Sequence, residues 1–149
     1  MKTVRDVLKN KNQQEVWSVQ PKATVFEALA LMGEKEIGAL MVIDEQGKVA
    51  GIISERDYAR KVILKGKASR DTAVKEIMTP VDHMYKVMPE TTIDECMVLI
   101  TGKRIRHVPV FDGDGFVGIV SIGDIMKSTL DEKDTLIEQL SNYIAGKYT

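Results

Sequence analysis

The sequence predicts an α+β protein made of two copies of one β-α-β-β-α module, followed by a C-terminal helix. The first observation is an internal repeat: residues 17–44 align without a gap on residues 85–112, with nine identities in 28 positions. The second is the pattern Gly-apolar-apolar-Ser-x-x-Asp, which occurs at residues 51–57 and again at 118–124, 118 − 51 = 67 residues later. This period is longer than the units of solenoid proteins, so we expect two fused copies of a compact module.

Length, composition and charge exclude several classes of protein. A chain of 149 residues with 44% hydrophobic residues is long enough for one ordinary domain or two small ones with a buried core. Twenty-one Lys and Arg balance 22 Asp and Glu, which gives no overall attraction to nucleic acid or to an anionic membrane. No apolar run reaches the roughly 20 residues that span a bilayer, and the polar N-terminus has no signal-peptide pattern. We therefore expect a cytoplasmic protein, and the single cysteine, Cys96, fits a reducing compartment.

The first half of each module is a short strand followed by an amphipathic helix. Residues 16–19 and 85–87 are expected to be strands that stop at Pro21 and Pro89, because proline cannot donate a ladder hydrogen bond. Both copies then spell Thr-x-x-Glu, at residues 24–27 and 92–95, which is typical of a capping box at a helix start. Apolar residues follow at helical spacing in both copies, and Cys96 lies on this stripe as a buried structural thiol.

The second half of each module is a hairpin followed by another helix. Strands are expected at 39–43 and 49–53 in the first copy and at 108–111 and 116–120 in the second, each pair joined by a Gly- and Asp-containing turn. The following helices are expected at about 56–64 and 123–130. Together these elements complete the β-α-β-β-α order twice.

Three segments lie outside the module pattern. Residues 4–8 and 74–78 resemble each other and are expected to form a short helix ahead of each module, while 65–71 is expected to be a linker. The C-terminal run repeats in neither half and places Leu136, Leu140, Tyr143 and Ile144 on one helical stripe, which fits either a dimer interface or packing on its own module. The predicted divisions are residues 1–67, 68–130 and 131–149.

The duplicated Ser-x-x-Asp has two interpretations. A serine at a helix N-cap with an acidic residue three positions later satisfies the free N–H groups of the first turn, which is a purely structural function. The same arrangement collects a hydroxyl, a carboxylate and backbone N–H groups at one strand exit, where they could hold a ligand. Its occurrence in both copies favours the second interpretation without excluding the first.

These patterns resemble a known family, the tandem CBS domains named after cystathionine β-synthase, over about residues 3–130. The phrases Gly-Ile-Ile-Ser-Glu-Arg-Asp, Ile-Arg-His-Val-Pro-Val and Glu-Ile-Met-Thr-Pro are typical of this family in combination. The resemblance implies two modules packed about a pseudo-twofold axis with two clefts between them. It also implies a homodimer, since two such pairs commonly associate into a flat disc.

The resemblance further implies an adenosine-containing ligand, of the AMP, ATP or NAD type, or S-adenosylmethionine. By position, Asp57 and Asp124 would bind the ribose hydroxyls, and Ser54 and Ser121 would help to hold the phosphate. A carboxylate can accept from two vicinal hydroxyls, and a helix N-terminus attracts phosphate. The adenine is expected near backbone groups at residues 16–17, 37–39, 78–79 and 105–107, a set that includes Met78, Thr79 and Ile105.

The two clefts are not expected to be equivalent. The second copy has Arg104, Arg106 and His107 where the first has Glu36, Gly38 and Ala39. Arginine matches the geometry of phosphate bidentately, so we expect these three residues to dominate phosphate binding in one cleft. The alternative is that they are surface charges beside a strand.

No enzymatic or metal-binding pattern is present. The sequence has neither the Gly-x-x-x-x-Gly-Lys-Ser/Thr loop nor Gly-x-Gly-x-x-Gly, and its two histidines and one cysteine lack the spacing of metal ligands. We therefore expect a regulatory module, without catalysis, nucleic acid or membrane binding, that reports a bound adenine nucleotide to an unidentified protein partner. The alternative is an interaction scaffold whose clefts are empty or vestigial.

Overall fold

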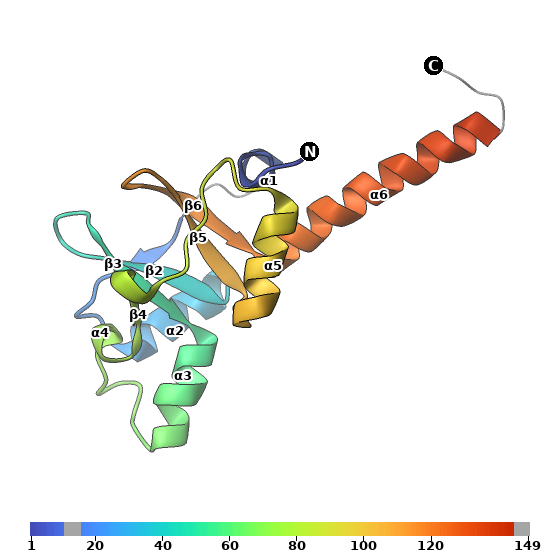
Figure 1. Ribbon diagram of the computed structural model, residues 1–149. Helices are drawn as coiled ribbons and strands as arrows, with labels where there is room; N and C mark the ends of the chain where they lie inside the picture. The colour runs from blue at the N-terminus through green and yellow to red at the C-terminus, as the bar shows by residue number, and fades with distance from the viewer. Residues whose placement is uncertain (11–15, 145–149) are drawn as a thin grey trace. The chain divides into compact units, whose positions relative to one another are not determined.

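The computed structural model describes residues 1–10 and 16–144 of the chain (Figure 1). These residues form two compact units. Residues 16–85 make up the N-terminal unit, and residues 86–144 together with 1–10 make up the C-terminal unit. Each unit has its own core and contains one copy of the repeated Gly-apolar-apolar-Ser-x-x-Asp pattern.

The N-terminal unit is a four-stranded sheet with helices. Its elements are β1 (Ser18–Val19), α2 (Val25–Lys35), β2 (Ala39–Ile43), β3 (Val49–Ser54), α3 (Glu55–Lys61), the 3₁₀ turn η1 (Ile63–Lys65), α4 (Val74–Ile77), β4 (Thr79–Pro80) and the 3₁₀ turn η2 (Val81–His83). The strands are ordered β1-β2-β3-β4, with β1 parallel to β2 and the other neighbours antiparallel. The predicted strand, helix, hairpin and second helix are confirmed, with shifts of a few residues at their ends.

The C-terminal unit repeats this order around a two-stranded sheet. Its elements are α1 (Val4–Asn10), α5 (Ile93–Lys103), β5 (His107–Asp112), β6 (Gly115–Ser121) and α6 (Ile122–Ile144), and β5 and β6 are antiparallel. The counterpart of β1 is a single parallel bridge between Val87 and Val110, so the predicted strand at 85–87 is reduced to one pairing. The α+β class and the two modules are therefore confirmed.

Both Thr-x-x-Glu patterns begin helices as predicted. The Thr24 hydroxyl accepts from the Glu27 N–H at 3.1 Å at the start of α2, and Thr92 does the same for the Glu95 N–H at 3.1 Å at the start of α5. These bonds satisfy N–H groups that have no partner within the helix. Local sequence therefore determines where both helices start.

Each unit is closed by a separate apolar core. In the N-terminal unit the core is formed by buried residues of α2, the β2–β3 hairpin and α4, including Leu40, Ile53 and Ile77. In the C-terminal unit Cys96 and Ile100 of α5 pack with the β5–β6 hairpin and with residues of α1. Cys96 is fully buried, as expected for a structural thiol, and this burial raises the pKa of its thiol.

Each of the two short lead-in helices packs on the module that it does not precede in the sequence. In α1, the Val4 N–H donates to the Thr91 carbonyl at 2.8 Å, so this helix belongs to the C-terminal unit. In α4, the Val74 N–H donates to the Ala23 carbonyl at 2.8 Å, so this helix belongs to the N-terminal unit. The divisions at 1–67 and 68–130 follow the sequence repeat, whereas packing assigns each lead-in helix to the other copy.

The helix α6 is longer than the module requires. The helix predicted at 123–130 and the predicted C-terminal helix form one continuous helix, α6. Residues 145–149, which the prediction of 131–149 includes, lie outside the described residues. Its buried residues are Ile125 and Ser128, both near its start. Figure 1 shows the rest of α6 extending well beyond the other elements of its unit. This extension exposes a stripe of large apolar side chains, namely Leu136, Ile137, Leu140, Tyr143 and Ile144.

Candidate functional site

In the N-terminal unit, β3 runs directly into α3 at Ser54, and the Ser-x-x-Asp pattern forms a complete capping box. The Ser54 N–H donates to Asp57 Oδ2 at 2.9 Å, and the Asp57 N–H donates to Ser54 Oγ at 3.3 Å. Ser54 Oγ also lies 3.1 Å from Asp57 Oδ2. The structural interpretation of this motif is therefore correct at this strand exit. Both side chains remain partly exposed, so the carboxylate stays accessible.

Lys61 makes a further contact with Asp57 that the sequence analysis did not include. Its Nζ lies 3.1 Å from Asp57 Oδ1 and donates to the Ile77 carbonyl at 2.9 Å. The Asp57 side chain is 15% exposed and the Lys61 side chain 44%. Lysine four residues after aspartate on one helix is a spacing that favours an ion pair, so this signal was present in the sequence. The contact connects α3 to the end of α4.

Met78 and Thr79 lie at the end of α4 and the start of β4, the strand that pairs with β3. Thr79 of β4 pairs with Ile52 of β3, two residues before Ser54. This pairing is possible because Gly51 has no side chain: a Cβ there would lie less than 3.0 Å from the Thr79 carbonyl and 3.1 Å from Met78 Sδ. We call Ser54, Asp57, Met78 and Thr79 the N-terminal strand-exit site. The structure thus gathers four of the predicted site residues in one unit.

The C-terminal unit repeats the strand exit where β6 runs into α6. The Ser121 N–H donates to Asp124 Oδ2 at 2.9 Å, and the Asp124 N–H donates to Ser121 Oγ at 3.0 Å. The glycine of this copy, Gly118, faces α1 instead of a strand, because a Cβ there would lie 3.2 Å from Leu8 Cδ2. The two strand exits therefore share their capping geometry and differ in what packs behind them.

Arg104, Ile105, Arg106 and His107 lie beside this second strand exit. Arg104 ends α5 in the left-handed conformation, with φ 54°, and the chain then enters β5 at His107. His107 pairs with Ser121, and the Ile122 N–H donates to the Arg106 carbonyl at 2.8 Å. Both arginines are exposed and His107 is partly buried. We call these four residues, with Ser121 and Asp124, the C-terminal strand-exit site.

The corresponding segment of the N-terminal unit has the same backbone and different charges. Glu36 is the left-handed residue, with φ 56°, Ala39 pairs with Ser54, and the Glu55 N–H donates to the Gly38 carbonyl at 3.1 Å. The duplication thus preserves the backbone at both strand exits. At these aligned positions the C-terminal copy carries Arg104, Arg106 and His107.

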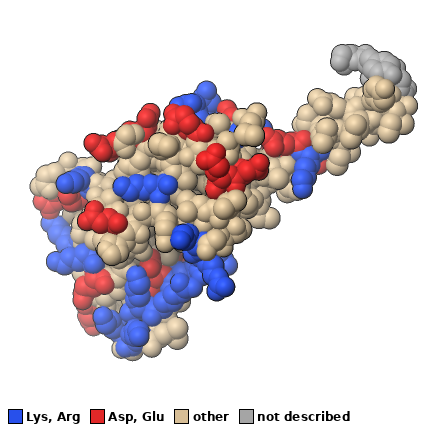
Figure 2. Space-filling model, in the orientation of Figure 1, with Lys and Arg blue, Asp and Glu red and all other residues tan. Residues whose placement is uncertain are grey.

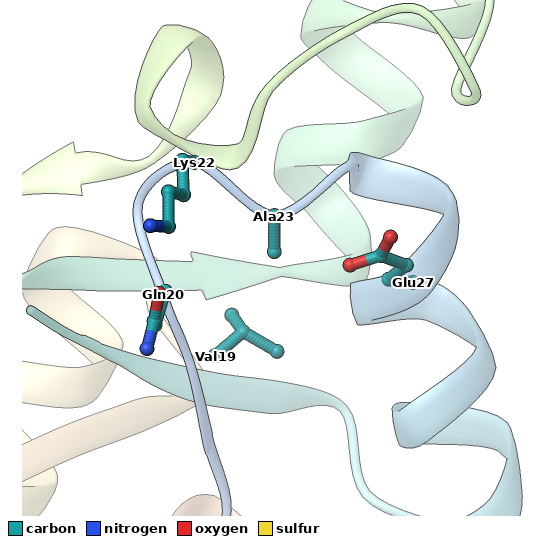
Figure 3. Close-up of a pocket in the computed structure, with 5 residues that line it drawn as sticks. All are labelled: Val19, Gln20, Lys22, Ala23 and Glu27. Carbon is teal, nitrogen blue, oxygen red and sulfur yellow. The ribbon is translucent and has the colours of Figure 1, made fainter. Parts of the chain in front are cut away.

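A pocket of about 390 Å³ opens in the N-terminal unit, away from the predicted site residues (Figure 3). It lies between the end of β1 and the first turn of α2, and Val19, Gln20, Lys22, Ala23 and Glu27 line it. Figure 3 shows Lys22 and Glu27 at its edges, with Val19 below them. Lys22 is also ion-paired with Glu45. None of the predicted ligand-binding residues contributes to this pocket.

Electrostatics and metal chemistry add no further candidate among the described residues. On the face shown in Figure 2, acidic and basic side chains are intermixed, with basic ones gathered at the end where Figure 1 draws α3. Within residues 1–10 and 16–144, no three His, Cys, Asp or Glu side chains are grouped as a metal site would require. In the same residues, no helix combines the length and the hydropathy needed to cross a bilayer.

Comparison with known proteins identifies the repeated module. The model of the CBS domain family matches this chain twice, at residues 3–64 and 74–131. The mitochondrial CBS domain-containing protein CBSX3 of Arabidopsis thaliana is 40% identical over 152 residues, covering 98% of this chain and 73% of that protein. The predicted cytoplasmic location stays a prediction, since this relative is described as mitochondrial.

Solved structures of CBS-domain proteins share the fold. A CBS-domain protein from Burkholderia ambifaria MC40-6 has a TM-score of 0.82 at 45% identity, covering 87% of this chain and 95% of that one. CBSX2, solved in complex with AMP, has a TM-score of 0.71 at 28% identity, covering 89% and 99%. A hexameric CBS-CP12 protein from bloom-forming cyanobacteria has a TM-score of 0.71 at 31% identity, covering 85% and 70%. The chain therefore belongs to the CBS domain family and carries two CBS domains in tandem.

Proposed function

We propose that this chain is a regulatory module that binds an adenosine-containing ligand, of the AMP, ATP or NAD type, and reports its presence to a partner protein. The carboxylates of Asp57 and Asp124 would accept from ribose hydroxyls, and the adjacent helix N-termini with Ser54 and Ser121 would hold phosphate. The observation that carries this proposal is the same serine–aspartate geometry at two strand exits, in a chain whose structural neighbour CBSX2 was solved with AMP. For such a switch, the ligand must favour one arrangement of the protein over another.

The proposal is tested by ligand-induced stabilisation. Melting temperatures are measured with AMP, ATP, NAD and S-adenosylmethionine, since a ligand at 100 times its dissociation constant stabilises the folded state by about 2.7 kcal/mol. The variant carrying both Asp57→Asn and Asp124→Asn should lose this response. Glu95→Gln is the matched control, because it changes the carboxylate that faces Thr92 at the start of α5, which is not a strand exit. If the control abolishes the response as fully as the double variant, the strand exits are not the binding site.

We also propose that the two sites bind phosphate unequally. Arg104, Arg106 and His107 lie at the C-terminal strand exit, where the N-terminal copy carries Glu36, Gly38 and Ala39. Titration calorimetry with AMP and with NAD should show a larger loss of affinity for Asp124→Asn than for Asp57→Asn, and a loss for Arg106→Ala. Equal losses for the two aspartate variants would contradict the inequality.

A second candidate function is an interaction scaffold with no nucleotide. It is favoured by the complete capping box at Ser54, which accounts for this motif without any ligand, and by the location of the described pocket elsewhere in the unit. On this account no adenine compound changes the melting temperature. The double aspartate variant then alters only the stability of the free protein.

For assembly we propose a homodimer that uses the exposed extension of α6. Leu136 and Leu140 are each 54% exposed, and with Tyr143 they lie on one stripe of the helix. A long helix with such a stripe is stabilised when another surface covers it. Light scattering should show a dimer that dissociates when Leu136 and Leu140 are both changed to Glu. An assembly of unchanged mass in that variant would show that another surface joins the copies.

A further inference from the structure

The contact between Lys61 and Asp57 bears on how the N-terminal strand-exit site could hold a ribose. A carboxylate offers about four lone-pair positions to hydrogen-bond donors. At Asp57, Oδ2 faces the Ser54 N–H at 2.9 Å and Ser54 Oγ at 3.1 Å, and Oδ1 faces Lys61 Nζ at 3.1 Å. Three of the four positions are therefore used, and one on Oδ1 remains. A ribose diol needs two.

Lys61 is held at this point by a second bond. Its ammonium donates to the Ile77 carbonyl at 2.9 Å, at the end of α4, next to Met78. This bond satisfies a carbonyl that has no partner within a helix of four residues. The Lys61 ammonium thus contacts both Asp57 Oδ1 and the Ile77 carbonyl oxygen. A ligand hydroxyl that displaced Lys61 from Asp57 would therefore also disturb the end of α4.

The C-terminal copy carries a different residue at the position of Lys61. The residue aligned with Lys61 is Ser128, at 61 + 67 = 128, four residues after Asp124. Ser128 is uncharged and only 6% exposed, so it cannot present an ammonium to Asp124. The lysine at this position of the helix is therefore a feature of the N-terminal copy.

From these contacts at Asp57, and resting on the proposed function, we infer that Lys61 limits the N-terminal strand-exit site to one ribose hydroxyl. Asp57 accepts a single hydroxyl on Oδ1 while Lys61 is in place, and the other hydroxyl has no acceptor on this carboxylate. The site should therefore discriminate little between AMP and 2′-deoxy-AMP. Removing the ammonium frees a second position and restores recognition of the full diol.

The test measures the preference for AMP over 2′-deoxy-AMP by titration calorimetry, in a chain carrying Asp124→Asn so that the N-terminal site dominates. The ratio of the two affinities cancels any contribution of Lys61 to phosphate binding. With Asp124→Asn alone the ratio should be no more than a few-fold. Adding Lys61→Met should raise it by about tenfold, the scale of one hydrogen bond to a charged group. Lys61→Arg, which keeps a cation, should leave the ratio low.

Every other outcome overturns the inference. An unchanged ratio in Lys61→Met would mean that Lys61 does not occupy a ribose position, and lost binding would mean that it assists the ligand. If Lys61→Met fails to fold, Lys61→Ser, which introduces the residue found at position 128, replaces it. Failure of the inference is distinct from failure of the proposed function: in the second case the unmodified chain binds neither nucleotide, whereas in the first it still binds AMP.

Discussion

Replacing Gly51 with alanine should destabilise the protein more than the same replacement at the aligned glycine of the second copy, because different atoms pack against the two positions. The new Cβ would lie less than 3.0 Å from the Thr79 carbonyl oxygen, 3.1 Å from Met78 Sδ and 3.2 Å from Pro80 Cα. Two of these three atoms belong to the backbone of β4 and cannot rotate away. The strand β4 must therefore move away from β3, which weakens the pairing of Gly51 with Pro80 and of Ile52 with Thr79.

The expected cost follows from overpacking. Extra methyl groups in a filled space typically cost 1–3 kcal/mol, and we expect about 3 kcal/mol here because backbone has to move. For a chain of this length, 1 kcal/mol lowers the melting temperature by roughly 2–4 °C, so Gly51→Ala should melt roughly 6–12 °C below the unmodified chain. The measurement is thermal unfolding followed by circular dichroism.

The matched control is the aligned glycine of the second copy. In Gly118→Ala the nearest atom to the new Cβ would be Leu8 Cδ2 at 3.2 Å, the end of a flexible side chain. A shift of a few tenths of an ångström relieves this contact, so the free energy of unfolding should fall by no more than about 1 kcal/mol. The reasoning is refuted if Gly51→Ala melts within 2 °C of the unmodified chain, or if Gly118→Ala is destabilised as much.

Three further predictions concern single side chains. Arg104 has φ 54°, a conformation that costs a non-glycine residue roughly 1 kcal/mol. Arg104→Gly should therefore raise the melting temperature and weaken AMP binding measured by calorimetry. A stabilised variant with unchanged affinity would show that Arg104 does not bind the phosphate. At the start of α1, the Thr3 N–H donates to Asp6 Oδ2 at 2.9 Å, and this bond lowers the pKa of Asp6 below its usual value. A carboxylate whose pKa is lowered by folding stabilises the folded state at pH values above its unfolded pKa, and this stabilisation is lost as the pH falls through its folded pKa. Asp6→Asn should therefore be less stable than the unmodified chain in denaturant titrations at pH 7 and equally stable near pH 2. An equal loss of stability at both pH values would argue against a contribution from the carboxylate. Because burial raises the pKa of the Cys96 thiol, a thiol reagent at pH 8 should react with it only in denaturant, and fast labelling of the folded chain would contradict its place in the core.

The sequence by itself determined the modules and the starts of their helices. The repeat, the Thr-x-x-Glu caps and the strand exits at Ser54 and Ser121 depend on hydrogen bonds between residues three positions apart, or on apolar spacing within one element. Such short-range patterns are set by the local chain, so they appear in the structure where they were predicted. The buried position of Cys96 followed from the same helical periodicity.

Only the tertiary structure decided which lead-in helix completes which module. Residues 4–8 and 74–78 have similar sequences, and nothing in either segment specifies the copy on which it packs. That choice depends on hydrogen bonds across long sequence separations, such as Val4 to Thr91. The tertiary structure also showed that Lys61 bonds to the Ile77 carbonyl as well as to Asp57. The helical spacing of Asp57 and Lys61 suggests the ion pair, but Ile77 lies 16 residues away, and folding alone brings its carbonyl to the same ammonium.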